Sequence, residues 1–114
     1  MSPGSSKRVK ISAVGKISKQ ITWTDASMNR DGNLIAVRGY SQVVFYPRTS
    51  SQTVADSLGG TACSFNSRTV ARSNQNQYEG VTFMAHPYFA EASECLNKMP
   101  CNVEVTRHKL KFNN

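Results

Sequence analysis

The sequence lacks a membrane span, a secretory leader and a disulfide framework. No stretch reaches the roughly 18 apolar residues of a spanning helix, and the first ten residues, MSPGSSKRVK, contain no apolar core of a signal peptide. Three cysteines form an odd set without regular spacing, which is typical of a reducing compartment. We therefore expect a protein of the host cytoplasm or of a virion, without a membrane partner.

Patterns for catalysis and metal binding are also scarce. The two histidines are His86, which precedes a proline, and His108, which lies between two cations. The spacing of Cys95 and Cys101 matches no zinc knuckle, and Gly59-Gly60 is not followed by the residues of a phosphate-binding loop. A Cys/His nucleophile pair stays open, because such partners need only meet in space. The sequence predicts no enzyme, no cofactor and no metal site.

What the sequence does contain is positive charge. Its 14 Lys and Arg residues outnumber 7 Asp and Glu, which gives a net charge of +7 at pH 7. Cations without acids occupy both ends of the chain: Lys7, Arg8, Lys10, Lys16 and Lys19 near the start, and Arg107, Lys109 and Lys111 near the end. Such an excess favours polyanionic partners, above all nucleic acid.

The longest β-rich run is NLIAVRGYSQVVFYPR, residues 33–48. Read with the two-residue period of a strand, it has one apolar face and one face of mixed polarity. The apolar face consists of Ile35, Val37, Gly39, Ser41, Val43 and Phe45, of which Ile35, Val37, Val43 and Phe45 are predicted core residues. The other face consists of Leu34, Ala36, Arg38, Tyr40, Gln42, Val44, Tyr46 and Arg48. We expect Gly39 to divide the run into two strands.

The mixed face suggests a binding surface. Arg38, Tyr40, Tyr46 and Arg48 combine cations that suit phosphates with rings that suit bases. An ordinary strand pair with solvated tyrosine edges explains the same pattern equally well.

Two further groups extend the predicted nucleic-acid site. A hairpin over residues 67–78 contributes Arg68, Arg72, Asn76 and Tyr78. The last strand carries Val103, Val105, Arg107, Lys109 and Lys111 on one face. No RNP octapeptide or KH-type GxxG loop is present, so the sequence predicts RNA or single-stranded DNA as a partner without a standard module.

The remaining elements follow from periodicity and turn residues. Strands are predicted over residues 9–13, 20–24, 64–73, 78–85 and 102–112, with a loop at 25–32 that contains the turn pair Asp31-Gly32. A short helix is expected at 52–58, capped from Thr49-Ser50-Ser51 and stopped by Gly59-Gly60. A longer helix is expected at 88–99, with Pro87 at its start.

These elements predict the fold class. Residues 1–6 are expected to be disordered. Residues 7–114 are expected to form a single α+β domain, a largely antiparallel sheet with one short and one longer helix.

Two segments resemble the coat proteins of small single-stranded RNA bacteriophages. VKISAVGKISKQITWTDASMNRDGNLIAVRGYSQ is similar to the strand, Gly-Lys turn, strand, loop and strand with which those proteins begin. SRTVARSNQNQYEGVTFMA resembles the hairpin that they place against genomic RNA. The resemblance implies that Arg68, Arg72, Asn76 and Tyr78 face RNA. It departs at the C-terminus, where those coats have helices that clasp a dimer partner and this chain is expected to have a strand.

The sequence therefore predicts a coat-type protein that forms a homodimer or larger homo-oligomer and binds RNA on a basic sheet face. Two alternatives stay open. One is a protein that binds single-stranded DNA or RNA without forming a shell. The other is a basic inhibitor or effector that engages an acidic protein.

Overall fold

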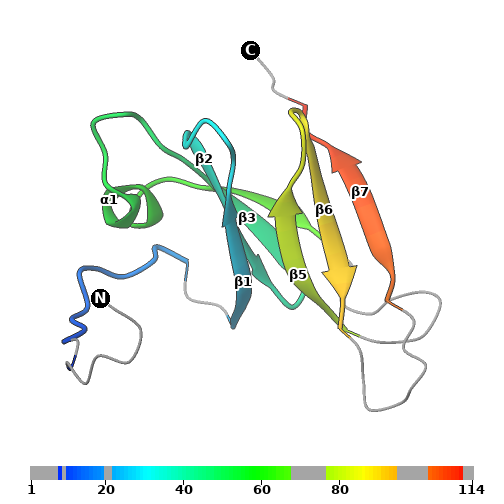
Figure 1. The fold of residues 1–114 in the computed structure, drawn as a ribbon, viewed down its shortest axis with the longest axis horizontal. Helices are drawn as coiled ribbons and strands as arrows, with labels where there is room; N and C mark the ends of the chain where they lie inside the picture. Colours follow the sequence, from blue (N-terminus) through cyan, green and yellow to red (C-terminus); the bar gives the residue numbers. More distant parts are fainter. Residues whose placement is uncertain (1–7, 9, 20–21, 68–76, 95–102, 112–114) are drawn as a thin grey trace.

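The computed structural model describes residue 8 and residues 10–19, 22–67, 77–94 and 103–111. These residues form two antiparallel sheets and one short helix (Figure 1). The first sheet has the order β1-β2-β3-β4, with β1 at Trp23–Met28, β2 at Leu34–Gly39, β3 at Gln42–Pro47 and β4 at Cys63–Asn66. The second has the order β5-β6-β7, with β5 at Tyr78–Phe83, β6 at Tyr88–Ser93 and β7 at Val105–Lys109. Helix α1, Val54–Leu58, lies on the side of the first sheet away from the second (Figure 1).

The predicted α+β fold class is wrong, because the longer helix does not form. Its first residues, Tyr88–Ser93, are strand β6, and α1 is the longest helix in the described residues; residues 95–99 lie outside them. The His86–Pro87 peptide is cis, and the Tyr88 N–H donates to the Ala85 carbonyl over 3.0 Å. This hydrogen bond closes a turn over residues 85–88. It returns the chain alongside β5, so the domain is mostly β.

A tight hairpin joins β2 to β3. Its register pairs Arg38 with Val43 and Val37 with Val44, so that only Tyr40 and Ser41 lie between the strands. Odd-numbered residues of β2 therefore share a face with even-numbered residues of β3. The two faces predicted for residues 33–48 are wrong, because they continued one alternation straight through Gly39. Two strands do form there, as predicted.

The β2–β3 hairpin is buried on both faces. Toward the second sheet, Ala36, Val43 and Phe45 pack with Val81 and Phe89. On the opposite face the buried residues are Ile35, Val37, Val44 and Tyr46, packed against Ile17, Trp23, Leu58 and Ala62. The four predicted core residues are thus all buried, but they belong to two clusters instead of one. Burial on both faces accounts for the nearly continuous apolar sequence of these strands.

The two sheets meet where β1 lies beside β5, and side chains make the connection. The Thr24 hydroxyl donates to the Glu79 carbonyl over 2.7 Å. The Val81 N–H donates to the Asp25 carboxylate over 2.9 Å, and the Phe83 N–H donates to the Ser27 hydroxyl over 3.2 Å. We call this the β1–β5 junction. It covers one edge of each sheet, which leaves β4 and β7 as the outer strands of the two sheets.

Helix α1 agrees with the predicted short helix but is capped by a different residue. Thr53 and Asp56 form a capping box, in which each side chain accepts a hydrogen bond from the other residue's backbone N–H. The hydrogen bonds that the Asp56 carboxylate accepts from Thr53, first from its backbone N–H and then from its side chain, lower the pKa of Asp56. The cap is therefore not in the Thr49-Ser50-Ser51 cluster, whereas Gly59 ends the helix as predicted.

The N-terminal strands also differ from the prediction. Residues 10–13 form no strand, and Ile11 is 90% exposed, so the predicted strand at 9–13 is wrong in its described part. Strand β1 continues through the predicted loop as far as Met28. The turn that follows contains Asp31-Gly32 as predicted, with Gly32 at a φ of 71°.

Candidate nucleic-acid interface

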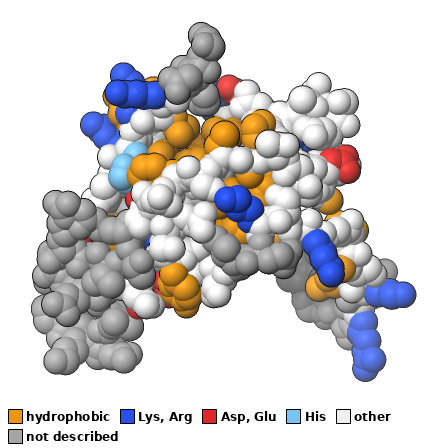
Figure 2. Space-filling view, turned by 180° about the vertical axis from the view of Figure 1, so that it is seen from behind, with side chains coloured by type: hydrophobic (Ala, Val, Ile, Leu, Met, Phe, Trp, Pro, Cys, Tyr) orange, Lys and Arg blue, Asp and Glu red, His pale blue; other side chains and the backbone are white. Residues whose placement is uncertain are grey.

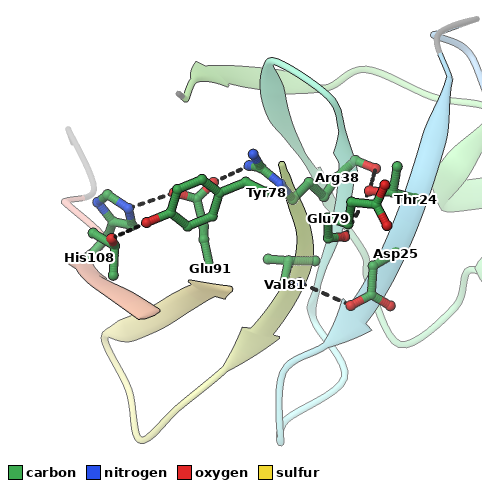
Figure 3. A network of polar contacts seen from close by, with 9 residues as sticks. Thr24, Asp25, Arg38, Tyr78, Glu79, Val81, Glu91 and His108 are labelled. Carbon is green, nitrogen blue, oxygen red and sulfur yellow. Dashed lines mark hydrogen bonds and ion pairs between the residues drawn. The ribbon is translucent and has the colours of Figure 1, made fainter. Parts of the chain in front are cut away.

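Arg38, predicted to meet phosphates, is completely buried between the two sheets. Its guanidinium forms an ion pair with one carboxylate oxygen of Glu91, and the other oxygen lies 2.7 Å from Nε2 of His108 (Figure 3). Burial lowers the pKa of Arg38, while the charge of Glu91 and the neighbouring Tyr78 raise it. The side chain is held inside the protein, where a nucleic-acid backbone does not reach it.

Tyr78, which was also predicted to face RNA, belongs to the same buried group. It is fully buried, its hydroxyl lies 2.8 Å from the hydroxyl of Thr106, and the Arg38 guanidinium lies 5.4 Å from its ring centroid. We call Arg38, Tyr78, Glu91, Thr106 and His108 the buried cluster. It connects β2 with all three strands of the second sheet, so its role is structural.

The remaining predicted residues of the 33–48 run do not share a surface either. Tyr46 is buried, and its hydroxyl accepts hydrogen bonds from the Ser18 hydroxyl at 3.2 Å and the Lys19 N–H at 3.3 Å. Arg48 donates to the Gly32 carbonyl over 2.9 Å and so supports the β1–β2 turn. Tyr40 is 39% exposed at the β2–β3 turn, at the other end of β2.

Strand β7 has the alternation that the sequence indicates. Arg107, Lys109 and Lys111 are exposed together with Val103 and Val105. The alternate residues Thr106 and His108 point inward to the buried cluster. Arg107 and Lys109 thus lie on the outer face of the second sheet, and the exposed Lys111 follows the end of β7. Arg68, Arg72 and Asn76 lie outside the described residues.

An aromatic ring that the sequence did not assign to the site lies beside Arg107 and Lys109. The Arg107 guanidinium lies 4.6 Å from the ring centroid of Tyr88, a cation–π distance. Tyr88 is the cross-strand partner of Lys109. We call Tyr88, Arg107, Lys109 and Lys111 the basic stripe. Sequence reasoning placed Tyr88 in a helix and therefore missed it; only the β6–β7 register brings it beside the cations.

A cleft of about 880 Å³ opens next to the basic stripe. It lies between the β1–β2 turn and the β5–β6 turn, and Tyr88 lines it as well as belonging to the stripe. Its apolar lining consists of Met28, Leu34, Pro47, Phe83, Met84, Ala85, Pro87, Tyr88 and Leu110, and its polar lining of Asn29, Arg30, Asp31, Asn33 and His86. These residues come from four separate stretches of sequence, so no local motif could have identified the cleft.

The exposed cations are not gathered in one place. On the face seen in Figure 2, Lys and Arg side chains lie mainly at two opposite margins, with exposed apolar side chains between them. The N-terminal segment, which carries the exposed Arg8, Lys10, Lys16 and Lys19, lies far from β7 (Figure 1). The basic stripe is the group of cations that has an aromatic ring and a cleft beside it.

Comparison with known proteins gives no relative: no family model matches, and neither a curated protein nor a solved structure matches the chain. The resemblance to phage coat proteins therefore stays a prediction. Within the described residues, no helix has the length and apolar character needed to cross a membrane. The same residues hold no group of three or more His, Cys, Asp or Glu side chains arranged for a metal ion.

Proposed function

We propose that this protein binds single-stranded RNA along the basic stripe. The observation that carries the proposal is the stacking of Arg107 on Tyr88 beside the exposed Lys109 and Lys111. Sheet surfaces that bind single strands use cations for the phosphates and aromatic rings for the bases. The basic stripe has cations and an aromatic ring on one face.

The charge of the stripe is available to a ligand. No acid among the described residues forms an ion pair with Arg107, Lys109 or Lys111, whereas Glu91 is paired with Arg38 and contacts His108 inside the protein. The net charge of +7 adds long-range attraction for a polyanion. The basic stripe therefore replaces the buried Arg38, Tyr46 and Tyr78 as the proposed contact surface.

Salt-dependent binding tests the proposal. Fluorescence anisotropy of a labelled single-stranded RNA should give a Kd that rises steeply with salt concentration, because phosphate contacts release counterions. Arg107→Ala and Lys109→Ala should each weaken binding and reduce the slope of log K against log salt by about one.

The matched control removes a charge elsewhere. Lys10→Ala deletes an exposed cation from the N-terminal segment, far from β7 (Figure 1). If Lys10→Ala changes the slope as much as Lys109→Ala does, the binding is non-specific attraction and the stripe is not the site.

Self-association as a coat-type protein is a second candidate, supported by the outer edge of β7. This strand ends its sheet, and no described strand pairs with its outer edge. Val105 is 64% exposed and Val103 is 49% exposed beside that edge. Unpaired strand edges with apolar side chains favour pairing with another chain.

The mass in solution tests this second candidate. Light scattering should give an oligomer or particle for the native chain, and the combined change Val103→Lys and Val105→Lys should shift it toward the monomer. Ultraviolet absorbance after a high-salt wash reports whether RNA is retained. A native monomer that carries no RNA would exclude a coat-type protein.

A further inference from the structure

The cleft beside the basic stripe has walls that are held in place by hydrogen bonds. In the β1–β2 turn, Asn29 Oδ1 accepts from the backbone N–H of Asn33 at 3.0 Å and of Leu34 at 3.1 Å. In the β5–β6 turn, the Met84 N–H donates to the Tyr88 carbonyl over 2.9 Å. Both walls are thus formed before any ligand binds, as is usual for ligand sites.

The floor of the cleft is apolar and its mouth is mixed. Leu34, Phe83 and Leu110 line it and also pack against the cluster between the sheets. Met28 and Met84 line it while remaining 43% and 47% exposed. Thioether groups make favourable contacts with aromatic rings. Such a lining suits a flat ring better than a charged group.

The polar residues and the charges around the cleft indicate which chemical groups its ligand carries. The exposed Asn33 and His86 add polar side chains to the lining, and Asn33 Oδ1 accepts a hydrogen bond from the Asn29 side chain over 2.6 Å. Arg30 lines the cleft, and the cations of the stripe lie beside the cleft. Among the described residues, Asp31 is the single acid in the lining. The occupant therefore combines an apolar ring, polar ring edges and attached negative charge.

From this geometry we infer that the cleft receives one unpaired base of the single strand bound along the basic stripe. The inference rests on the proposed function and adds to it a site for a base. Tyr88 belongs to both the stripe and the cleft, so the two surfaces meet at this residue. A strand whose phosphates follow the cations can thus direct a base into the cleft. The volume of about 880 Å³ lies within the range of small-ligand sites.

Photochemical crosslinking tests where the base lies. A single-stranded RNA of about twelve nucleotides, with one 5-iodouridine placed in turn at each position, is bound to the intact chain and irradiated, and crosslinked peptides are identified by mass spectrometry. We expect at least one position to crosslink to Phe83 or Met84, which line the cleft and do not belong to the stripe. Retained binding with crosslinks only outside the cleft would overturn the inference.

Filling the cleft gives a second test. Ala85 is exposed and lines the cleft, so Ala85→Trp should occupy the place of the base, lower the cleft crosslinks and weaken binding by about tenfold, the scale of one stacked base. Val54→Trp, on the exposed side of α1, is the matched control and should change neither. Equal affinities and crosslink yields for the two variants would refute the base site. If the native chain binds no RNA at all, the proposed function itself fails.

Discussion

Strands β2 and β7 carry similar side chains, but those of β2 are buried on both faces, whereas every second side chain of β7 is exposed. Both place an arginine among apolar residues, yet Arg38 on β2 is completely buried and Arg107 on β7 is exposed. The difference comes from their places in the sheets. Strand β2 has a neighbour on each side and packing on each face, whereas β7 is an outer strand with an exposed face. Position in the sheet, and not composition alone, decides whether a cation meets solvent.

The two positions place different demands on the rest of the chain. A buried guanidinium needs an acid, because an unpaired charge in the interior is costly. Arg38 has Glu91, which lies 53 residues away in the sequence. The exposed Arg107 needs no acid and is free to rest on the ring of Tyr88. Four experiments test this contrast, from the largest expected effect to the smallest.

Removing the acid from the buried cluster should have the largest effect. Glu91→Gln keeps the shape of the side chain but leaves the Arg38 charge without its carboxylate. We expect the free energy of unfolding to fall by about 3–5 kcal/mol, measured by urea denaturation. A loss below about 1 kcal/mol would show that the ion pair contributes little.

Replacing both partners should restore part of this loss. Arg38→Met leaves Glu91 buried without its cation, and the combination of Arg38→Met with Glu91→Leu removes both charges. Because apolar residues often replace a buried ion pair at little cost, the double variant should be more stable than the sum of the two single changes predicts, by about 2 kcal/mol. Additive effects in the double-mutant cycle would mean that the two side chains do not act as a pair.

A smaller effect is expected at Tyr78. Tyr78→Phe removes the hydrogen bond between its hydroxyl and that of Thr106, and should cost about 1 kcal/mol of stability. The same variant should bind RNA as the native protein does, because the side chain is buried. Thermal unfolding and anisotropy measure the two quantities on one sample. If this variant binds RNA more weakly while keeping its full stability, Tyr78 takes part in RNA contact.

The basic stripe should show the reverse behaviour. Arg107→Ala is expected to change the free energy of unfolding by less than about 0.5 kcal/mol, because the side chain is exposed and forms no ion pair with a described residue. Instead, the variant should lower the affinity for RNA and reduce the slope of log K against log salt. A strong loss of stability in this variant would give Arg107 a structural role like that of Arg38.

Local sequence signals predicted the parts of the fold that depend on neighbouring residues. The Asp31-Gly32 turn, the stop at Gly59 and the alternation on β7 are all present. The failures involve partners distant in the sequence. Residues 88–93 were predicted to begin a helix, but they form β6 because they pair with β5 on one side and with β7 on the other.

The candidate site shows the same limit more strongly. The exposure of Arg107, Lys109 and Lys111 follows from the alternation along one strand. The burial of Arg38 does not, because it depends on the packing of β2 against a sheet that contains Glu91. The cleft and the place of Tyr88 depend on the β6–β7 register and on two turns far apart in the chain.

The β1–β5 junction has a consequence for how the molecule opens. Backbone ladders hold each sheet together, but at this junction the Val81 and Phe83 N–H groups donate to the side chains of Asp25 and Ser27. Among the described residues, opening at this junction breaks side-chain hydrogen bonds and no backbone ladder, so we expect local opening to begin there. In hydrogen exchange, these two amides should lose protection before the amides that β2 and β3 share. The Arg38–Glu91 ion pair also joins the two sheets and should slow this loss of protection.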